Sequence, residues 1–193
     1  MLTLAACATP RTNNNLGVNK LLEEQRIGWL QQQQQWQFEG RFSIRIDDDK
    51  GSNGGTGKLS WKQSPGRLEM SFYGALGRGA WHLLANPEHA ELALADGRVV
   101  RGDSVESIIN SELGWDLPVA DFSLWLRGMP GQDRTANIRS TDQLGRPESI
   151  SYKSWQIKYL SWMPVGKYSL PKKIELTAPG RKLKLSVKNW NFQ

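Results

Sequence analysis

Apolar and polar residues alternate with a period of two along most of this chain, which is the pattern of β-strands that bury one face. The alternation begins at Trp36 and resumes after turn residues at 49–51 and 64–66. The predicted strands cover residues 36–46, 58–62, 68–72, 81–84, 91–95, 99–100, 150–153, 155–160, 173–177 and 182–187. Because short turns join many of them, we predict an antiparallel sheet of about ten strands.

Three segments carry apolar residues at helical spacing instead. The first runs from Val18 to about Gln35, with Asn15 or Asn19 available as its N-cap. Two more are predicted at about 103–129, one opened by a capping sequence at 103–106 and ended by Gly114, the other starting at Pro118. The chain is therefore predicted to be mainly β with helices, an α+β fold.

The helices have to cover the apolar face of the sheet. Two arrangements remain open: the sheet curls tightly and fills itself, or it curls loosely around a cavity that the helices close. The 9 Trp among 193 residues favour the second arrangement, because large aromatic side chains suit an apolar cavity. The length fits one domain with a sizeable core and is short for two.

The single cysteine, Cys7, follows a short run of small residues, Ala5-Ala6, and this resembles the lipobox of bacterial lipoproteins. The alternatives are a secretory leader that happens to contain a cysteine, or a buried cysteine. We expect residues 1–6 to be the remnant of a signal peptide, 7–17 to be the acylated Cys7 and a flexible tether, and 18–193 to be one domain. Ala8, in place of Asp, is compatible with export to the outer membrane.

A net charge of +6 and a pI near 9.5 favour anionic partners, either nucleic acid or anionic lipid headgroups. The basic residues are scattered one per strand position, as at Lys182 and Lys184, which is also the pattern of a solvated outer sheet face. Charge alone does not choose between these partners.

Motifs for catalysis or metal binding are weak. The segment GSNGGTGK at 51–58 lacks residues that a phosphate loop needs, and we interpret it as a flexible hairpin loop. His82 and His89 have no partners at zinc-ligand spacing, and no nucleophile elbow is present. We predict no catalytic residues, no metal, no cofactor and no enzymatic activity; a lipid hydrolase is the enzyme alternative.

Several segments together resemble one family. They are WQFEGRFSIRI (36–46), LSWKQ (59–63), RLEMSFYGALGRGA (67–80), the most specific segment LGWDLPVADFSLWLRGMPG (113–131), and LKLSVKNWNF (183–192). In this order they resemble the LolB family of outer-membrane lipoprotein receptors of Gram-negative bacteria, over essentially the whole chain.

The resemblance implies an open antiparallel β-barrel around a hydrophobic cavity, closed by a helical lid at about 103–129. It implies an outer-membrane protein, lipid-anchored at Cys7 and facing the periplasm, that accepts acylated lipoproteins from the periplasmic carrier LolA and inserts them into the inner leaflet. Leu76 matches the family's membrane-inserting leucine, although Ala75 stands where a Pro often precedes it. We expect a monomer that binds no nucleic acid.

The acyl-chain cavity is expected to be built from apolar residues of the inner sheet face and the mid-chain helices. The candidates are Phe42, Ile44, Trp61, Met70, Phe72, Trp81, Ile109, Leu113, Trp125, Leu126, Trp155 and Ile157. The alternative function is an outer-membrane lipoprotein that carries phospholipid or stabilises an envelope assembly.

Overall fold

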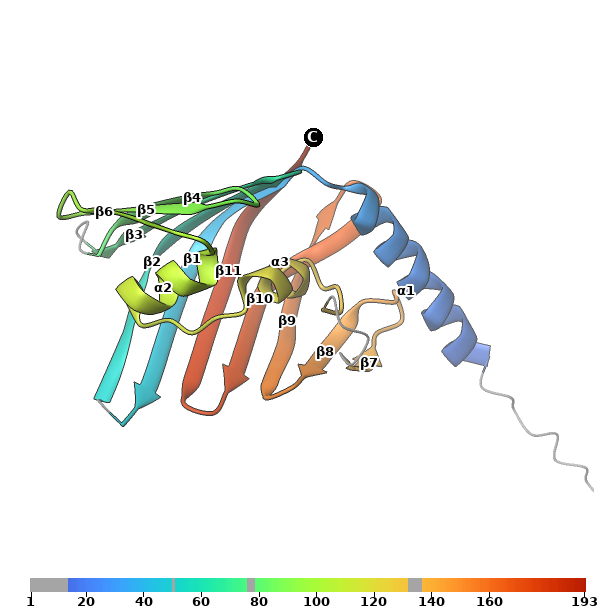
Figure 1. Ribbon diagram of the computed structural model, residues 1–193. Helices are drawn as coiled ribbons and strands as arrows, with labels where there is room; N and C mark the ends of the chain where they lie inside the picture. Colours follow the sequence, from blue (N-terminus) through green and yellow to red (C-terminus); the bar gives the residue numbers. More distant parts are fainter. Residues whose placement is uncertain (1–13, 50, 76–78, 132–136) are drawn as a thin grey trace, which may run out of the picture.

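The computed structural model describes residues 14–49, 51–75, 79–131 and 137–193. Within them the chain forms one 11-stranded sheet in which every neighbouring pair is antiparallel, as predicted (Figure 1). The strands are β1 (Trp36–Asp48), β2 (Gly51–Ser64), β3 (Arg67–Gly74), β4 (Trp81–Ala85), β5 (Ala90–Leu94), β6 (Val99–Gly102), β7 (Asn137–Thr141), β8 (Pro147–Tyr152), β9 (Trp155–Val165), β10 (Tyr168–Ala178) and β11 (Arg181–Phe192).

The sheet is open, with the order β6-β5-β4-β3-β2-β1-β11-β10-β9-β8-β7. Each half is a meander of consecutive strands, and the first and last strands, β1 and β11, pair in the middle and join the halves. β6 and β7 are the two edges, so the sheet does not close into a complete barrel.

Strand β1 shows why this sequence forms a sheet with one buried face. Phe38, Phe42, Ile44 and Ile46 are buried, while the residues between them are exposed or half-buried. A bulge shifts the register against β11 between Glu39 and Gly40. Only glycine fits at position 40, because a Cβ there would lie 2.6 Å from the carbonyl oxygen of Ser186. The bulge increases the local twist and bend of the strand.

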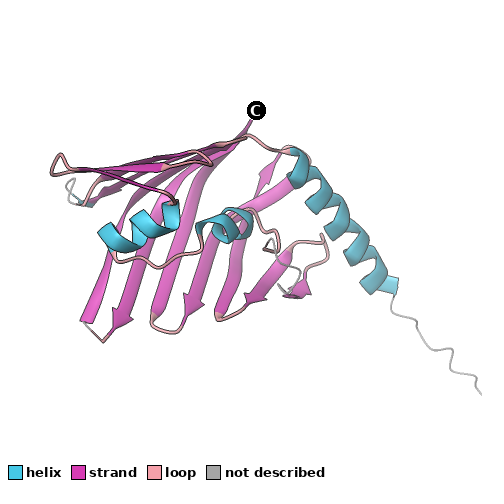
Figure 2. Ribbon diagram, viewed as in Figure 1, coloured by secondary structure: helices cyan, strands magenta, loops and turns pink. Residues whose placement is uncertain are grey.

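Two of the three helices found in the described chain, α2 (Val105–Leu113) and α3 (Val119–Trp125), lie against one face of the sheet (Figures 1 and 2). The Ser104 hydroxyl accepts a hydrogen bond from the backbone N–H of Ser107 and caps α2, and Gly114, at φ 68°, ends it. We define the helical cover as α2, the linker 114–118 and α3.

The third helix, α1 (Asn14–Gln32), packs at the side of the sheet. Trp29 contacts the rings of Tyr168 and Phe192, and Tyr168 donates a hydrogen bond from its hydroxyl to the carbonyl of Gln25. No described helix is both long enough and apolar enough to cross a bilayer.

Several predicted boundaries were wrong. Helix α1 begins at Asn14 and ends at Gln32, so Asn15 and Asn19 lie within it, and neither is its N-cap. Residues 51–58, predicted as a loop, belong to β2, because their backbone pairs with β1, with Gly57 opposite Phe42. Strand β7 was not predicted from the sequence. Cys7 and Leu76 lie outside the described residues.

Candidate acyl-chain pocket

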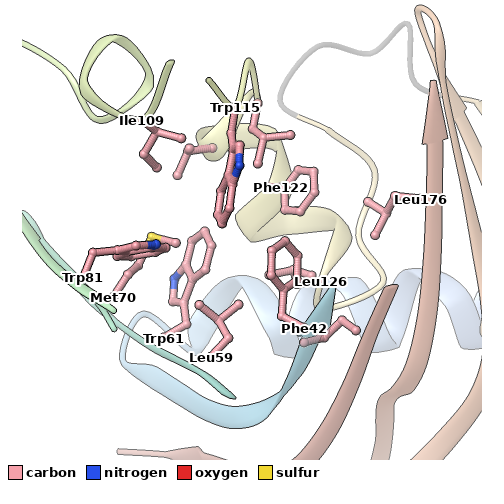
Figure 3. Close-up of a pocket in the computed structure, with 13 residues that line it drawn as sticks. Phe42, Leu59, Trp61, Met70, Trp81, Ile109, Trp115, Phe122, Leu126 and Leu176 are labelled. Atoms are coloured by element: carbon pink, nitrogen blue, oxygen red, sulfur yellow. The ribbon is translucent and has the colours of Figure 1, made fainter. Parts of the chain in front are cut away.

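An apolar pocket lies between the sheet and the helical cover (Figure 3). Its lining comes from β1, β2, β3, β4, β10, β11, the cover and the turn that follows α3. The lining residues are Phe42, Leu59, Trp61, Met70, Trp81, Ile109, Trp115, Leu117, Val119, Phe122, Leu126, Leu176 and Leu185. All of them carry apolar or aromatic side chains, so the pocket suits a hydrocarbon ligand.

The lining combines the side chains that alternate toward one face of the strands with side chains of the linker, which runs over that face. Side chains of the strands that point toward the cover meet Ile109, Trp115 and Phe122, which point back toward the sheet (Figure 3). The Trp115 ring lies 6.1 Å from Phe42 and 6.1 Å from Trp81, measured between centroids. The linker thus contributes the central aromatic side chain of the pocket.

Side chains fill most of the pocket. Its free volume is about 30 Å³, which is about the volume that one water molecule occupies in the liquid. An acyl chain is far larger, so it can enter only if the helical cover or the lining side chains move.

A few polar contacts hold the helical cover on the sheet. Asp116 in the linker forms an ion pair with Arg181 of β11, with a 2.6 Å distance between Oδ2 and Nη2. Asn53 of β2 donates from Nδ2 to the carbonyl oxygen of Leu113 at 3.0 Å. At the other end, the buried Tyr159 hydroxyl, whose pKa burial raises, donates to the carbonyl oxygen of Trp125 at 2.7 Å.

Two buried arginines connect α1 to the end of α3. Arg26 of α1 donates to the carbonyl oxygens of Arg127 and Gly128, and Arg127 donates back to those of Leu30 and Gln33. Their guanidinium groups also lie over tryptophan rings, Arg26 over Trp162 and Arg127 over Trp36.

Burial lowers the pKa of both guanidinium groups to about 10, so both remain cationic at neutral pH. Neither forms a salt bridge with a carboxylate of the described chain. We call this pair, Arg26 and Arg127, the arginine clasp.

Sequence reasoning identified about half of the pocket. Of the predicted cavity residues, Phe42, Trp61, Met70, Trp81, Ile109 and Leu126 line it. Phe72 is buried beside it, against the rings of Phe42, Trp81 and Trp115. The remaining candidates, Ile44, Leu113, Trp125, Trp155 and Ile157, do not line it.

The candidates that do not line the pocket belong to neighbouring parts of the same core. Trp125, the last residue of α3, packs against Tyr152 and Trp155, and Ile44 and Ile157 are buried on the sheet. Leu113, at the end of α2, is half-buried. The alternation that predicts an inward side chain therefore does not distinguish the pocket from the packed core around it.

Sequence reasoning did not name seven lining residues, and it did not name the clasp. Leu59, Leu176 and Leu185 lie on strands and share the alternation of the named residues, whereas Trp115 and Leu117 lie in a linker without periodicity. Arg26 had a usable signal, because it falls four residues after Leu22 and four before Leu30, on the apolar side of α1.

Among the described residues no group of three or more His, Cys, Asp or Glu is placed to hold a metal ion. His82 lies on the sheet face opposite the helical cover, with its Nδ1 2.8 Å from the Ser71 hydroxyl, and His89 lies 3.5 Å from the Asn86 side chain. These two histidines thus have ordinary polar partners.

Residues 34–190 match the family described as "Outer membrane lipoprotein LolB". The chain is 33% identical over 168 residues to the outer-membrane lipoprotein LolB of Pseudomonas syringae pv. syringae, covering 84% of this chain and 80% of that protein. It is 31% identical over 155 residues to the protein of the same name from Stutzerimonas stutzeri, covering 80% of this chain and 73% of that protein.

Two solved structures share the fold at low sequence identity. A putative outer membrane lipoprotein-sorting protein domain from Vibrio parahaemolyticus aligns with a TM-score of 0.51 at 12% identity, covering 93% of this chain and 94% of that one. A DUF1329 family protein from Desulfovibrio piger aligns with a TM-score of 0.53 at 9% identity, covering 93% of both chains.

Proposed function

The chain belongs to the LolB family of outer-membrane lipoproteins, and on that premise we propose that its pocket holds the acyl chains of lipoproteins on their way into the outer membrane. The chain acts in lipoprotein localisation and resides at the outer membrane through a lipid anchor. The observation that carries the role of the pocket is its lining, which consists entirely of apolar side chains from the sheet, the helical cover and the turn after α3.

The helical cover acts as the lid of this pocket. Because the free volume is about 30 Å³, the described conformation is the closed one, and cargo enters when the cover moves away from the sheet. The cover's attachments include two ion pairs, Asp116 with Arg181 and Glu112 with Arg98, and single hydrogen bonds. Contacts of this kind contribute about 1 kcal/mol each, so a cargo acyl chain can compensate for their loss.

The donor of the cargo is the periplasmic carrier LolA, and the destination is the inner leaflet of the outer membrane. Transfer needs no nucleotide if the affinity for acyl chains rises from carrier to receptor to bilayer. Each buried methylene contributes about 0.8 kcal/mol, so small differences in fit between two apolar cavities set the direction.

Cys7 and Leu76 carry the membrane-facing steps of this proposal. The acylated Cys7 holds the domain at the membrane, since several acyl chains on one residue anchor far more firmly than one. Leu76 enters the inner leaflet of the outer membrane, to which the protein is anchored, and promotes release of the cargo. Its burial in lipid contributes about 1.5–3 kcal/mol, which is enough to favour docking and too little to anchor the protein.

The test separates acceptance from delivery. We expect Leu76→Glu to accept a labelled lipoprotein from LolA normally but to insert it into liposomes about tenfold more slowly. Leu144→Glu is the matched control, because Leu144 is an exposed leucine, 59% accessible, in the turn between β7 and β8. Normal insertion by Leu76→Glu, or equal loss in both variants, would exclude the role of Leu76.

A further inference from the structure

The sheet face opposite the helical cover carries a row of basic side chains. Arg41 of β1 lies opposite Lys58 of β2 on one side and Ser186 of β11 on the other, and Ser186 lies opposite Lys173 of β10. Lys188, two residues after Ser186, extends the row along β11. We call Arg41, Lys58, Lys173 and Lys188 the basic row.

The alternation of the strands determines where these side chains point. Arg41, Lys58, Lys173 and Lys188 are exposed, whereas their neighbours Phe42, Leu59, Ile174 and Val187 are buried on the side of the cover. The two faces of β1, β2, β10 and β11 therefore differ: one contributes to the apolar core and pocket, and the other carries the basic row.

The sheet is hollowed beneath the row. An open groove of about 920 Å³ follows the bulge at Gly40, and Arg41, Lys58, Lys188 and Tyr73 line it together with Glu39. A second hollow of about 370 Å³, lined by Arg41, Lys58, Tyr73 and Ala75, continues to the end of β3. The basic surface thus reaches Ala75, the residue directly before Leu76 in the sequence.

The charges of the row are not neutralised by the described part of the protein. None of the four side chains forms an ion pair or a hydrogen bond with a described residue, whereas Lys182 and Lys184, near the start of β11, lie 3.4 and 3.8 Å from Glu175. Two large exposed side chains flank the row: Tyr73 is 56% accessible and Leu160 is 62% accessible. Unpaired cations beside an exposed tyrosine and leucine are the composition of a surface that meets a lipid headgroup layer.

We propose that this face binds anionic phospholipid headgroups at the membrane surface. The proposal rests on the proposed function, in which Leu76 enters the bilayer. Headgroups bound along the basic row would hold the end of β3, which shortly precedes Leu76 in the sequence, against the membrane, while the pocket on the opposite face stays free for cargo. The row then orients the receptor, a task that a flexible tether at Cys7 does not perform.

The test measures the binding of the full-length chain carrying Cys7→Ser to vesicles, so that no acyl anchor contributes. The vesicles consist of phosphatidylethanolamine alone, or of phosphatidylethanolamine with one third phosphatidylglycerol. Each basic residue at an anionic surface strengthens binding about fivefold. We therefore expect Arg41→Gln/Lys58→Gln to bind the phosphatidylglycerol vesicles about 25-fold more weakly, and neither protein to bind well to phosphatidylethanolamine alone.

The matched control, Lys153→Asn/Lys167→Gln, removes the same charge from two exposed turns outside the row. Asn suits position 153, where φ is 49°. We expect this pair to weaken binding less than threefold. Equal losses in both double variants would show a general effect of net charge, and unchanged binding by Arg41→Gln/Lys58→Gln would show no role for the row; either result overturns the proposal.

A membrane-free measurement separates this proposal from the proposed function. Transfer of a labelled lipoprotein from LolA to the soluble chain should be equal in the parent and in both double variants. If vesicle binding is unchanged and transfer falls only in Arg41→Gln/Lys58→Gln, the face meets an acidic protein partner and the lipid proposal is wrong. If the parent itself accepts no cargo, the proposed function fails, and the vesicle result still decides the role of the row.

Discussion

Val119, the first residue of α3, lies where the helical cover meets the apolar pocket, and its side chain is only 5% accessible. A larger side chain at this position would occupy the space that an acyl chain needs. We expect Val119→Trp to reduce acceptance of a lipoprotein at least tenfold. Overpacking should also lower the free energy of unfolding by about 1–3 kcal/mol, which leaves a domain of ordinary stability folded.

The control for this variant is Val99→Trp, because Val99 is 48% accessible on the edge strand β6. It should accept cargo and unfold like the parent protein. Both properties are measured on the same samples, by transfer from loaded LolA and by urea unfolding. Normal acceptance by Val119→Trp would mean that the acyl chain lies somewhere other than this pocket.

The arginine clasp gives a second prediction for single residues. Arg26→Ala leaves the carbonyl groups of Arg127 and Gly128 without their donor, and hydrogen bonds from charged groups contribute about 1.5–3 kcal/mol. We expect the free energy of unfolding, measured by urea titration of tryptophan fluorescence, to fall by about 2–4 kcal/mol. Arg26→Lys should recover less than half, because an ammonium group does not reproduce the planar fork. A loss below about 1 kcal/mol in Arg26→Ala would contradict this account.

The two residues of the clasp show what sequence reasoning can and cannot reach at this scale. The helical spacing of Leu22, Arg26 and Leu30 places Arg26 on an apolar face, so its burial was predictable in principle. Its acceptors were not, because they lie 101 and 102 residues away in the sequence. Trp115 is similar, since a linker has no period from which its direction could be inferred.

At the scale of elements, the linker 114–118 joins α2 to α3 and attaches the helical cover to the sheet. Asp116 is its polar attachment, through the ion pair with Arg181 of β11. We expect Asp116→Ala to accelerate uptake of a fluorescent fatty acid about twofold to fivefold, because a partly exposed ion pair contributes up to about 1 kcal/mol. Stopped-flow mixing measures this rate directly.

Glu91→Ala is the control for the linker. It removes a 2.8 Å ion pair between two residues of the sheet, Glu91 of β5 and Arg101 of β6. The uptake rate should stay unchanged in this variant. If Asp116→Ala does not differ from it, the linker does not take part in opening, and the cover moves by another route.

The strands with one buried face were predictable because that face imposes the alternation, as in β1. The first half of β2 was not, since residues 51–58 are rich in glycine and largely exposed, and they form a strand because they pair with β1 and, at Gly57 and Lys58, also with β3. The predicted bounds of α1 were wrong at both ends. The helix begins at Asn14, before the first apolar residue of the pattern, and it ends at Gln32, although the rest of the glutamine run also has good helix propensity.

At the scale of the whole molecule, the open sheet separates two environments. The side of the helical cover buries an apolar pocket, and the opposite side carries the basic row. Alternation along each strand predicts two such faces. The apolar face has to be covered by other elements, and the helices predicted in the middle of the chain were the candidates for this cover. The small free volume of the pocket was not predictable, because it depends on how Trp115 and Phe122 pack against the strands.

The most direct test of the central claim is site-specific photocrosslinking during cargo transfer. A photoreactive phenylalanine replaces Phe122, in the pocket, or Tyr73, on the opposite face, and each protein is mixed with LolA that carries an acylated lipoprotein. We predict a crosslink to the cargo from position 122 and none from position 73, and none from either position when the cargo lacks its acyl chains. A crosslink from position 122 that does not require acylation, or no crosslink there after the cargo has been accepted, would contradict the account.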